Sequence, residues 1–423
     1  MAIQAPRGTR DVLPAESYRW QYLEEKMRKA AALAGYREVR TPVFEHTELF
    51  ARGVGDTTDI VQKEMYTFND KGNRSITLKP EGTAGAARCF LESNLYADAL
   101  PCKMYYLNAP IFRYEAPQSG RLREHHQFGL ECFGAQDATV DAELILLAYH
   151  LLEELGVKNL SFRINSIGCP NCRPSYHGAL KDFLVSRLDG LCEDCKNRYE
   201  RNPLRVLDCK KPGCKAQVKD APSMLDYLCE ECRDHFAQLK ACLQSEGIPF
   251  AVDSRIVRGL DYYTKTVFEL VTETDGGALT VCGGGRYDHL VAQLGGPDLP
   301  AVGFGMGIER VLMLLDSEGI EIPKPDQYEV FVTYMKDNRA EAFALVQALR
   351  RQGIRADMDH CSRSLKAQFK YANKTGARFA ATIGEEEART GTVRVKDMGS
   401  GEERTVALAE AGDTIRKMRK EAE

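Results

Sequence analysis

The chain has 423 residues, of which 43% are hydrophobic and 28% are charged, a balance typical of a globular protein with more than one packed core. No apolar run reaches the roughly 20 residues that a membrane-spanning helix needs. The opening residues lack the apolar stretch of a secretion signal, so we expect a cytoplasmic protein. The net charge of −4 argues against a general nucleic-acid coat.

The charge is divided unevenly along the chain. Residues 328–423 hold 18 Lys and Arg against 15 Asp and Glu, whereas residues 1–327 hold 39 against 46. A mildly basic C-terminal part on an acidic body suits a protein that contacts a polyanion at one end. Differences of this size are also common without such a partner, so the pattern alone decides little.

The predicted elements begin with a helix over 17–34, where apolar residues recur at steps of three and four. Residues 39–50 indicate a strand interrupted by Pro42 and followed by a short helix. Residues 103–114 and 126–134 are strand-like on either side of a polar loop. They predict a long antiparallel hairpin.

Many strands follow a predicted helix over 138–155. We expect these strands near 160–166, 250–252, 266–272, 278–282 and 301–306, and a closing helix over 307–317. This order favours an α+β body around a mostly antiparallel sheet flanked by helices. Between the strands near 165 and 250 lies an insertion, 169–245, that is rich in cysteine and charge.

The Pro-bearing segment 322–327 marks a domain boundary. We therefore divide the chain into a body of 1–325, which carries the insertion, and a C-terminal domain of 326–423. Strands and helices alternate in the second part, which predicts a small α/β domain.

One helix of the C-terminal domain carries a stripe of positive charge. Segment 364–378 predicts a helix capped by Ser364, in which lysines recur every four residues, at Lys366, Lys370 and Lys374. The stripe suits contact with RNA, and a merely solvated helix face is the alternative.

The hairpin carries the densest group of polar residues. Alternation along a strand places Arg113 and Glu115 on one face, and it places Gln127, Gly129 and Glu131 together on one face of the partner strand. Such a set indicates the floor of a pocket. Solvated positions of an edge hairpin are the alternative.

Two further places suit the binding of phosphates. Arg121 in the hairpin loop and Arg310, at the start of a predicted helix, carry guanidinium groups there. Gly303, Gly305 and Gly307 recur at period two, which strips one strand face of side chains and lets a flat group lie against the backbone. The same glycines would also fit a bend between packed elements.

Two shorter segments combine charge with hydroxyl groups. Arg258 is followed closely by Tyr262 and Tyr263, which suits phosphate neutralisation together with polar recognition, although core tyrosines would give the same pattern. Glu81 and Thr83 stand at the opening of another predicted helix, where Thr83 would also serve as a cap.

Together these segments resemble the class II aminoacyl-tRNA synthetases, and among them the histidyl-tRNA synthetase family. Segment 39–50 is similar to motif 1, the dimer-forming element, segment 112–131 to motif 2 and segment 303–310 to motif 3. RGLDYYT from Arg258 and EGT from Glu81 resemble stretches peculiar to the histidine enzymes, and RGTRDVLP resembles their N-terminal opening. The resemblance covers the whole chain, including a C-terminal anticodon-binding domain.

The resemblance implies a cytoplasmic homodimer that activates L-histidine with ATP and transfers it to tRNA(His), with Mg²⁺ accompanying ATP. It implies Arg113 and Arg258 as catalytic residues on the α-phosphate. The residues that it implies for ATP are Arg113, Arg121, His125, Arg258 and Arg310. The residues that it implies for histidine are Glu81, Gly82, Thr83, Gln127, Glu131, Tyr262 and Tyr263.

Specificity for histidine would come from Glu131 and Tyr263, each facing one imidazole nitrogen. An apolar substrate would leave the Glu131 carboxylate buried and unpaired, which rejects it. His125 departs from the family pattern, which has Phe at this position as a ring stacked on adenine. An imidazole ring can stack as well.

Eight of the 14 cysteines lie between residues 169 and 232 of the insertion. Three pairs have the spacing Cys-x-x-Cys, namely Cys169 and Cys172, Cys192 and Cys195, and Cys229 and Cys232; Cys209 and Cys214 form a looser pair. Eight thiolates would suffice for two structural zinc sites, or for one site with four spare thiols. Small buried or idle thiols are the alternative.

Two rival functions remain at this stage. One is a catalytically silent relative, such as the regulatory subunit of ATP phosphoribosyltransferase, which we would expect to lack parts of the motifs and the anticodon-binding domain. The other is a zinc-binding or redox-sensing interaction protein built around the cysteine-rich insertion.

Overall fold

The computed structural model describes residues 3–55, 58–118, 120–158, 160–274, 277–325 and 328–422. Contacts divide the chain into two compact units, 1–322 and 323–423, each with its own hydrophobic core. The division falls within the Pro-bearing segment 322–327, of which residues 326–327 lie outside the described residues. Among the described residues, no helix is long and apolar enough to cross a membrane.

The first unit is built on an eight-stranded sheet in the order β1-β5-β6-β11-β10-β9-β7-β8. Its strands are β1 (Arg37–Glu38), β5 (Cys102–Phe112), β6 (Glu124–Phe133), β7 (Ser161–Ser166), β8 (Phe250–Val252), β9 (Thr264–Thr274), β10 (Gly277–Arg286) and β11 (Ala301–Gly307). Only the outer pairs β1–β5 and β7–β8 are parallel among these strands, which confirms the α+β fold class with a mostly antiparallel sheet.

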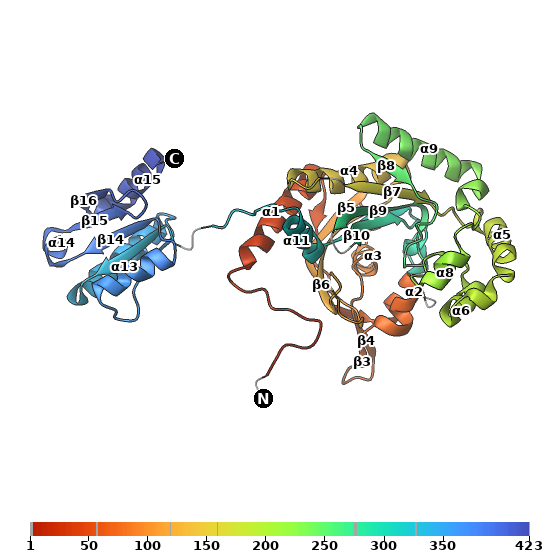
Figure 1. Cartoon of the computed structure of the whole chain (residues 1–423), viewed down its shortest axis with the longest axis horizontal. Coiled ribbons are helices and arrows are strands. Elements are labelled where there is room, and N and C mark those ends of the chain that lie inside the picture. The colour runs from red at the N-terminus through yellow and green to blue at the C-terminus, as the bar shows by residue number, and fades with distance from the viewer. Residues whose placement is uncertain are drawn as a thin grey trace. The chain divides into compact units, whose positions relative to one another are not determined.

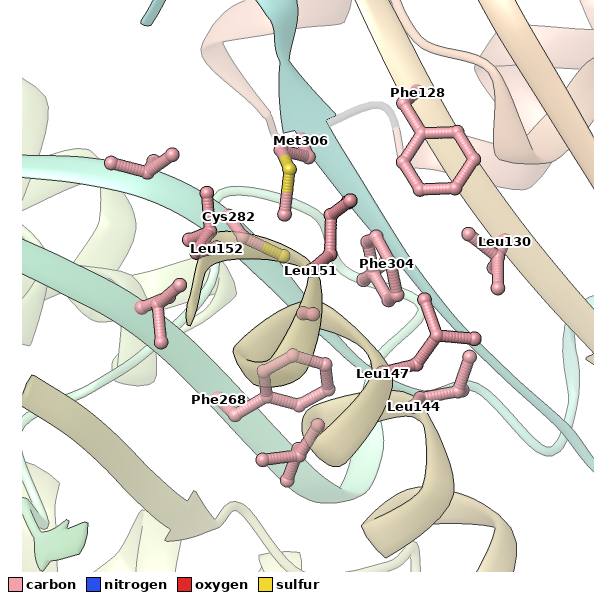
Figure 2. Packing of buried hydrophobic residues seen from close by; sticks show 14 of the residues in the cluster. Phe128, Leu130, Leu144, Leu147, Leu151, Leu152, Phe268, Cys282, Phe304 and Met306 are labelled. Carbon is pink, nitrogen blue, oxygen red and sulfur yellow. The ribbon is translucent and has the colours of Figure 1, made fainter. Parts of the chain in front are cut away.

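One face of this sheet packs against helices. The helices that share its core are α1 (Ser17–Leu33), α4 (Ala138–Glu154), α9 (Glu230–Ser245) and α11 (Ile308–Ser317). Figure 2 shows the leucines of α4 against aromatic and aliphatic side chains of the strands. On β6 these are Phe128 and Leu130, whose register partners on β11 are Met306 and Phe304. Helix α4 is capped at its N-terminus by Asp137, whose carboxylate accepts a hydrogen bond from the Thr139 N–H at 2.9 Å.

The intervening residues of β6 and β11 point to the opposite face of the sheet. In the register of the two strands, Gln127 stands beside Gly307, Gly129 beside Gly305, and Glu131 beside Gly303. Each of these β6 residues therefore has a glycine as its neighbour, which leaves room above the backbone. The sequence predicted this shared face correctly.

A small three-stranded sheet and two helices lie next to the large sheet. They are β2 (Phe44–His46), β3 (Thr67–Asn69), β4 (Ser75–Leu78), α2 (Thr47–Val54) and α3 (Thr83–Glu92). The strand expected over 39–50 is wrong in extent. The Val39 N–H donates to Tyr105 O beside the large sheet, whereas Phe44 pairs with Leu78 in the small one. The chain changes sheets at Pro42, which has no N–H to offer.

The insertion between β7 and β8 is helical. Its helices are α5 (Arg173–Val185), α6 (Glu193–Arg201), α7 (Leu204–Leu207), α8 (Pro212–Gln217) and α9 (Glu230–Ser245). Figure 1 shows α5, α6 and α8, in yellow-green, gathered in one group, while α9 returns to lie beside α4. The group has a small core of its own, in which several cysteines take part.

The second unit is a five-stranded sheet in the order β13-β12-β14-β15-β16, with helices. Its elements are β12 (Val330–Tyr334), α12 (Arg339–Arg351), β13 (Ala356–Met358), α13 (Leu365–Lys374), β14 (Phe379–Ile383), α14 (Glu385–Thr390), β15 (Thr392–Asp397), β16 (Glu403–Ala407) and α15 (Ala411–Ala422). The short helix α10 (Leu290–Gln293) belongs to the first unit. The sequence did not predict α14 and β16. Ser364 occupies the N-cap position of α13, as predicted, but its side chain makes no capping hydrogen bond.

Candidate functional site

A cavity of about 580 Å³ opens over the glycine-bearing face of the large sheet. It is lined by six arginines, Arg10, Arg19, Arg113, Arg121, Arg258 and Arg310, and by four carboxylates, Glu16, Glu115, Glu309 and Asp316. Three of these carboxylates pair with arginines of the wall, Glu16 with Arg10, Asp316 with Arg19 and Glu115 with Arg121, which leaves three of the six arginines outside these pairs. The wall is therefore positive overall, and we call this part the open half of the site.

Arg113 lies just beyond the end of β5, not within the strand. The predicted placement of Arg113 and Glu115 on a strand face is wrong, because β5 ends at Phe112. The Tyr114 N–H leaves the hairpin and donates to Glu64 O at 2.7 Å. The Arg113 side chain is held by a hydrogen bond from Nε to Pro80 O at 2.8 Å, so its terminal nitrogens extend toward the cavity that it lines.

Arg310 lies in the first turn of α11 and is fixed by two backbone carbonyls. Its Nε donates to Gly120 O at 2.9 Å and its Nη1 donates to Thr280 O at 2.7 Å. Burial lowers the pKa of Arg310, and the guanidinium groups of Arg121 and Arg113 lower it further. These cations therefore repel one another, and an anion bound between them would relieve that repulsion.

Arg258 lies at the border of the cavity, just before β9. It pairs with Glu269 of β9 and receives a hydrogen bond from Arg205 Nη1 on its backbone carbonyl at 3.0 Å. A Cβ at Gly283 would lie 2.4 Å from Arg258 Nη1, so a larger residue there would displace the guanidinium. The Nε of Arg258 is buried without a hydrogen-bond partner among the described residues, which leaves a donor for a ligand.

His125 lines the open half beside these cations. Burial lowers its pKa to about 3, and the charges of Arg113, Arg310 and His126 add to that effect. The imidazole is therefore neutral at neutral pH and offers an uncharged ring face. His126 next to it contacts Glu309 through Nδ1 at 2.9 Å.

A closed cluster of polar groups surrounds Glu131, and we call it the closed half of the site. The Glu131 carboxylate is fully buried and accepts hydrogen bonds from Thr83 Oγ1 at 2.8 Å, from Tyr106 OH at 3.1 Å and from Tyr287 OH. Burial raises the pKa of Glu131 to about 8, although the hydrogen bonds from Tyr287, Thr83 and Tyr106 oppose that shift.

Glu81 closes the start of α3. Its carboxylate accepts hydrogen bonds from the N–H groups of Thr83 at 2.7 Å and Ala84 at 2.8 Å. The alternative in which Thr83 caps this helix is therefore wrong, because Glu81 does so and the Thr83 hydroxyl turns to Glu131 instead. Between them, Gly82 is required because a Cβ there would lie 2.3 Å from the Tyr106 ring.

Three tyrosine rings complete the closed half. The centroid of the Tyr262 ring lies 4.7 Å from that of Tyr263 and 5.3 Å from that of Tyr287. The Tyr263 hydroxyl lies close enough to the Arg258 guanidinium to influence its pKa, which joins the closed half to the open half. A Cβ at Gly303 would lie 2.0 Å from Glu131 Oε2, so the glycine makes the space that the carboxylate occupies.

The structure therefore brings the predicted site residues together in two adjoining groups. The open half is lined by Arg113, Arg121, His125, Gln127, Arg258 and Arg310. The closed half holds Glu81, Gly82, Thr83, Glu131, Tyr262 and Tyr263, of which all but Gly82 take part in contacts described above.

Sequence reasoning missed three residues of this site. Tyr106 and Tyr287 donate to Glu131, and Glu269 pairs with Arg258. Glu269 interrupts the apolar run of β9, a signal that was available in the sequence. Tyr106 was detectable only through its register with Gly129, which depends on a bulge in β5 between Tyr106 and Ala109.

The comparisons with known proteins agree with this geometry over the length of the chain. The family profile described as histidyl-tRNA synthetase matches residues 8–311, and the one described as anticodon binding domain matches residues 329–418. The chain belongs to the histidyl-tRNA synthetase family. The first of these profiles spans both halves of the site, and the second lies within the second compact unit.

Individual members of the histidyl-tRNA synthetase family are similar across nearly all of their length. The chain is 56% identical over 417 residues to the histidine–tRNA ligase of Caldanaerobacter subterraneus subsp. tengcongensis, covering 98% of this chain and 100% of the relative. It is 58% identical to that of Alkaliphilus oremlandii, covering 96% and 97%. The apo histidyl-tRNA synthetase of S. aureus has the same fold, with a TM-score of 0.85, 38% identity and coverage of 98% and 100%.

A more distant structure shares the fold alone. It is described as an ATP phosphoribosyltransferase regulatory subunit/histidyl-tRNA synthetase from Bacillus halodurans C, with a TM-score of 0.65 and 22% identity over 91% of this chain and 98% of that one.

Proposed function

We propose that the chain is a histidine–tRNA ligase, a class II aminoacyl-tRNA synthetase. It activates L-histidine with ATP to give histidyl-adenylate and pyrophosphate, and it then transfers histidine to the 3′ end of tRNA(His). The observation that carries the proposal is the junction of an arginine-lined cavity with a buried carboxylate–tyrosine cluster at Arg258. Full-length similarity to histidine–tRNA ligases supports it.

The open half would perform the activation step. A carboxylate oxygen of histidine forms a bond to the α-phosphorus of ATP, and the bond from that phosphorus to the bridging β-oxygen breaks, so that pyrophosphate leaves. Negative charge develops on the α-phosphate oxygens, where Arg113 and Arg258 stabilise it. No general base is needed, because the attacking carboxylate is already ionised.

Around this centre, the other residues of the open half hold ATP. Arg310 and Arg121 bind the outer phosphates, and the neutral ring of His125 stacks on adenine. Mg²⁺ is expected with ATP, and the Glu115 carboxylate at the cavity wall offers the oxygen ligand that this ion prefers beside phosphate oxygens.

The closed half would select histidine. Glu131 and Tyr263 face the two imidazole nitrogens, and Tyr262 lines the same pocket. Glu81, Gly82 and Thr83 hold the ammonium group, together with Gln127 from the adjoining open half. A substrate without ring nitrogens leaves Glu131 buried with fewer partners, at a cost of about 1–3 kcal/mol, which rejects it.

The second unit and the dimer complete the proposal. Residues 326–423 would bind the anticodon arm, with the exposed lysines Lys366, Lys370 and Lys374 of α13 facing the RNA backbone. A homodimer would form through segment 39–50, where Phe44 is 53% exposed and Val43 is 42% exposed.

One assay tests the function. Exchange of labelled pyrophosphate into ATP should depend on histidine and should be absent with phenylalanine or without amino acid. Absence of histidine-dependent exchange would overturn the proposal. A catalytically silent regulatory subunit would show no exchange and would instead alter the activity of ATP phosphoribosyltransferase.

A second assay separates the two units. A chain that ends at residue 325 should keep pyrophosphate exchange if it still dimerises, and it should charge tRNA(His) poorly. Replacement of all three lysines of α13 by Ala in the full chain should weaken tRNA binding without a change in exchange. Efficient tRNA charging by the shortened chain would contradict the role of residues 326–423.

A further inference from the structure

The cysteines of the insertion lie close together in space, in two clusters. Eight of its nine cysteines, all but Cys242, form two separate groups of four, in each of which the sulfur atoms all lie within 4.8 Å of one another. The first thiol group is Cys169, Cys172, Cys229 and Cys232, and the second thiol group is Cys192, Cys195, Cys209 and Cys214. Each group joins two segments that are distant in sequence.

The sulfur–sulfur distances fit metal ligation and not disulfide bonding. In the first thiol group, Cys169 Sγ lies 3.7 Å from Cys172 Sγ and 3.8 Å from Cys229 Sγ. A disulfide would need about 2.05 Å. A tetrahedral zinc ion with bonds of about 2.3 Å to four sulfurs has sulfur–sulfur edges of about 3.8 Å.

Backbone donors also point at the sulfurs. The Cys229 N–H donates to Cys172 Sγ at 3.1 Å, and the Cys192 N–H donates to Cys214 Sγ at 3.2 Å. Hydrogen bonds of this kind stabilise a thiolate, the form that binds a metal. The same pattern in both groups indicates two sites of one kind.

The core of the insertion gives a second reason to expect bound metal ions. Its own core is small, and six of the eight cysteines are buried members of it. A core in which thiols take so large a share would gain folding free energy from a metal bound to them.

We propose that the insertion binds two Zn²⁺ ions, one in each thiol group, and that the two ions hold the segment 258–265 from two sides. Each site has four thiolate ligands and no open position for water, so the ions are structural. The segment 258–265 carries Arg258 and Tyr263, so its importance for catalysis rests on the proposed function, whereas the metal content does not.

The first thiol group adjoins the end of this segment. Arg173, directly after Cys172, donates from its guanidinium to Tyr263 O. Glu231, between Cys229 and Cys232, accepts from Lys265 Nζ at 2.8 Å. The Lys265 N–H donates to Gly168 O at 2.8 Å, directly before Cys169. An ion there would fix both cysteine pairs against the start of β9.

The second thiol group adjoins the beginning of the segment. Arg205 lies in α7, between the two cysteine pairs, and donates to Arg258 O at 3.0 Å. Asn202 Nδ2 donates to Asp261 Oδ1 at 3.1 Å. Arg198 of α6 pairs with Asp59, outside the insertion. An ion there would hold α6 and α7 together, and with them the contact to Arg258.

Metal analysis of the full chain tests the sites. Protein from cells supplied with both iron and zinc should contain about two zinc ions per chain. The double variants Cys169→Ser/Cys172→Ser and Cys192→Ser/Cys195→Ser should each contain about one. The control Cys361→Ser, which alters an exposed cysteine outside both groups, should contain two.

Wild-type protein keeps the test decisive if a double variant fails to fold. Titration with a mercurial reagent should release two zinc ions as it consumes eight thiols. Less than about half a zinc per chain, iron in place of zinc, or disulfide bonds within the native groups would each overturn the proposal.

Hydrogen exchange tests the hold on segment 258–265. Loss of the second ion in Cys192→Ser/Cys195→Ser should speed exchange in the insertion and in 258–265, while β5 and β6 exchange as in wild type and in Cys361→Ser. If a variant that has lost its zinc shows an unchanged rate of hydrogen exchange in 258–265, the ions do not stabilise this segment, although the metal sites themselves remain supported.

Discussion

The open and closed halves of the site share one face of the large sheet, yet they differ in the charge that they carry. The open half has positive side chains around a cavity, whereas the closed half has a buried acidic group. In the open half, guanidinium groups of Arg113, Arg258 and Arg310 line a cavity, and burial together with nearby guanidinium charges lowers the pKa of Arg310 and of His125. In the closed half, the carboxylate of Glu131 is fully buried and each of its oxygens already has a hydroxyl donor.

The difference indicates a division of labour. Positive charge around a cavity attracts an anion and stabilises the charge that develops during reaction, so it acts mainly on rate. A buried carboxylate must exchange its hydroxyl partners for those of a ligand, so a ligand that cannot replace them is penalised. The open half would therefore set how fast the chemistry proceeds, and the closed half which amino acid takes part.

The largest expected effect is in the open half. Arg258→Ala should lower the rate of histidyl-adenylate formation by about 10²–10³-fold, with much smaller changes in the binding of ATP and histidine, because the guanidinium acts mainly on the transition state. Single-turnover kinetics measures the rate at saturation.

The matched control is Arg255→Ala, three residues earlier, whose side chain is 72% exposed and pairs with Asp253. It should leave the rate unchanged. If Arg258→Ala only weakens binding and keeps the rate of the bound complex, the assignment of Arg258 to the open half is wrong.

Two neighbouring glycines offer a way to damage one half at a time. A Cβ at Gly303 would lie 2.0 Å from Glu131 Oε2 and 2.5 Å from Leu130 O, whereas a Cβ at Gly305 would lie 3.4 Å from the Gln127 amide. Gly303→Ala should therefore raise KM for histidine by about 10–100-fold, since such overpacking costs about 1–3 kcal/mol.

Gly305→Ala is the comparison, because Gly305 lines the open half. It should change KM for ATP more than KM for histidine, and both effects should be smaller. Equal effects of the two substitutions on the two substrates would show that the halves are not separate.

Much of this architecture could be predicted from the sequence, because it depends on periodicity. The helix over 17–34, the hairpin and the strands of the large sheet other than β1 were predicted within a few residues of their observed bounds. The shared face of Gln127, Gly129 and Glu131 followed from alternation alone. The family resemblance then supplied the residues that no periodicity could single out.

The errors lie where backbone hydrogen bonds leave the local pattern. Arg113 was predicted on a strand, but the Tyr114 N–H donates to a residue from another segment. Tyr106 and Tyr287 were not predicted, because their hydroxyls meet Glu131 only through strand register and close glycines. The pairing of cysteines into two groups was likewise open, since spacing fixes each pair but not which pairs meet.

The next effect concerns stability and pH. Because the folded state raises the pKa of Glu131 from 4.5 to about 8, the folded chain holds a proton that the unfolded chain has lost in this range. Stability therefore falls as pH rises from about 4.5 to about 8, by at most about 1.4 kcal/mol per pH unit from this group, and levels off above it.

Glu131→Gln removes this contribution. The difference in unfolding free energy between wild type and this variant, measured by urea denaturation at several pH values, should move in favour of the variant as pH rises to about 8. Glu81, Tyr106 and Tyr287 face Glu131 in both chains, so their own titration largely cancels. Parallel stability curves would show that Glu131 is already ionised at low pH.

The smallest expected effect that still distinguishes the two halves is a change in the KM for histidine. Glu131→Gln keeps the shape of the side chain but cannot ionise, so it never offers the two acceptor oxygens that the ionised carboxylate presents to the Tyr287 and Thr83 hydroxyls and to an imidazole N–H. The KM for histidine should rise tenfold or more, about 1.4 kcal/mol or above, while KM for ATP stays within about twofold. Glu154→Gln, at an exposed pair with Lys26, is the control and should change neither. Unchanged histidine kinetics in Glu131→Gln would remove Glu131 from the pocket and leave the closed half as a structural core.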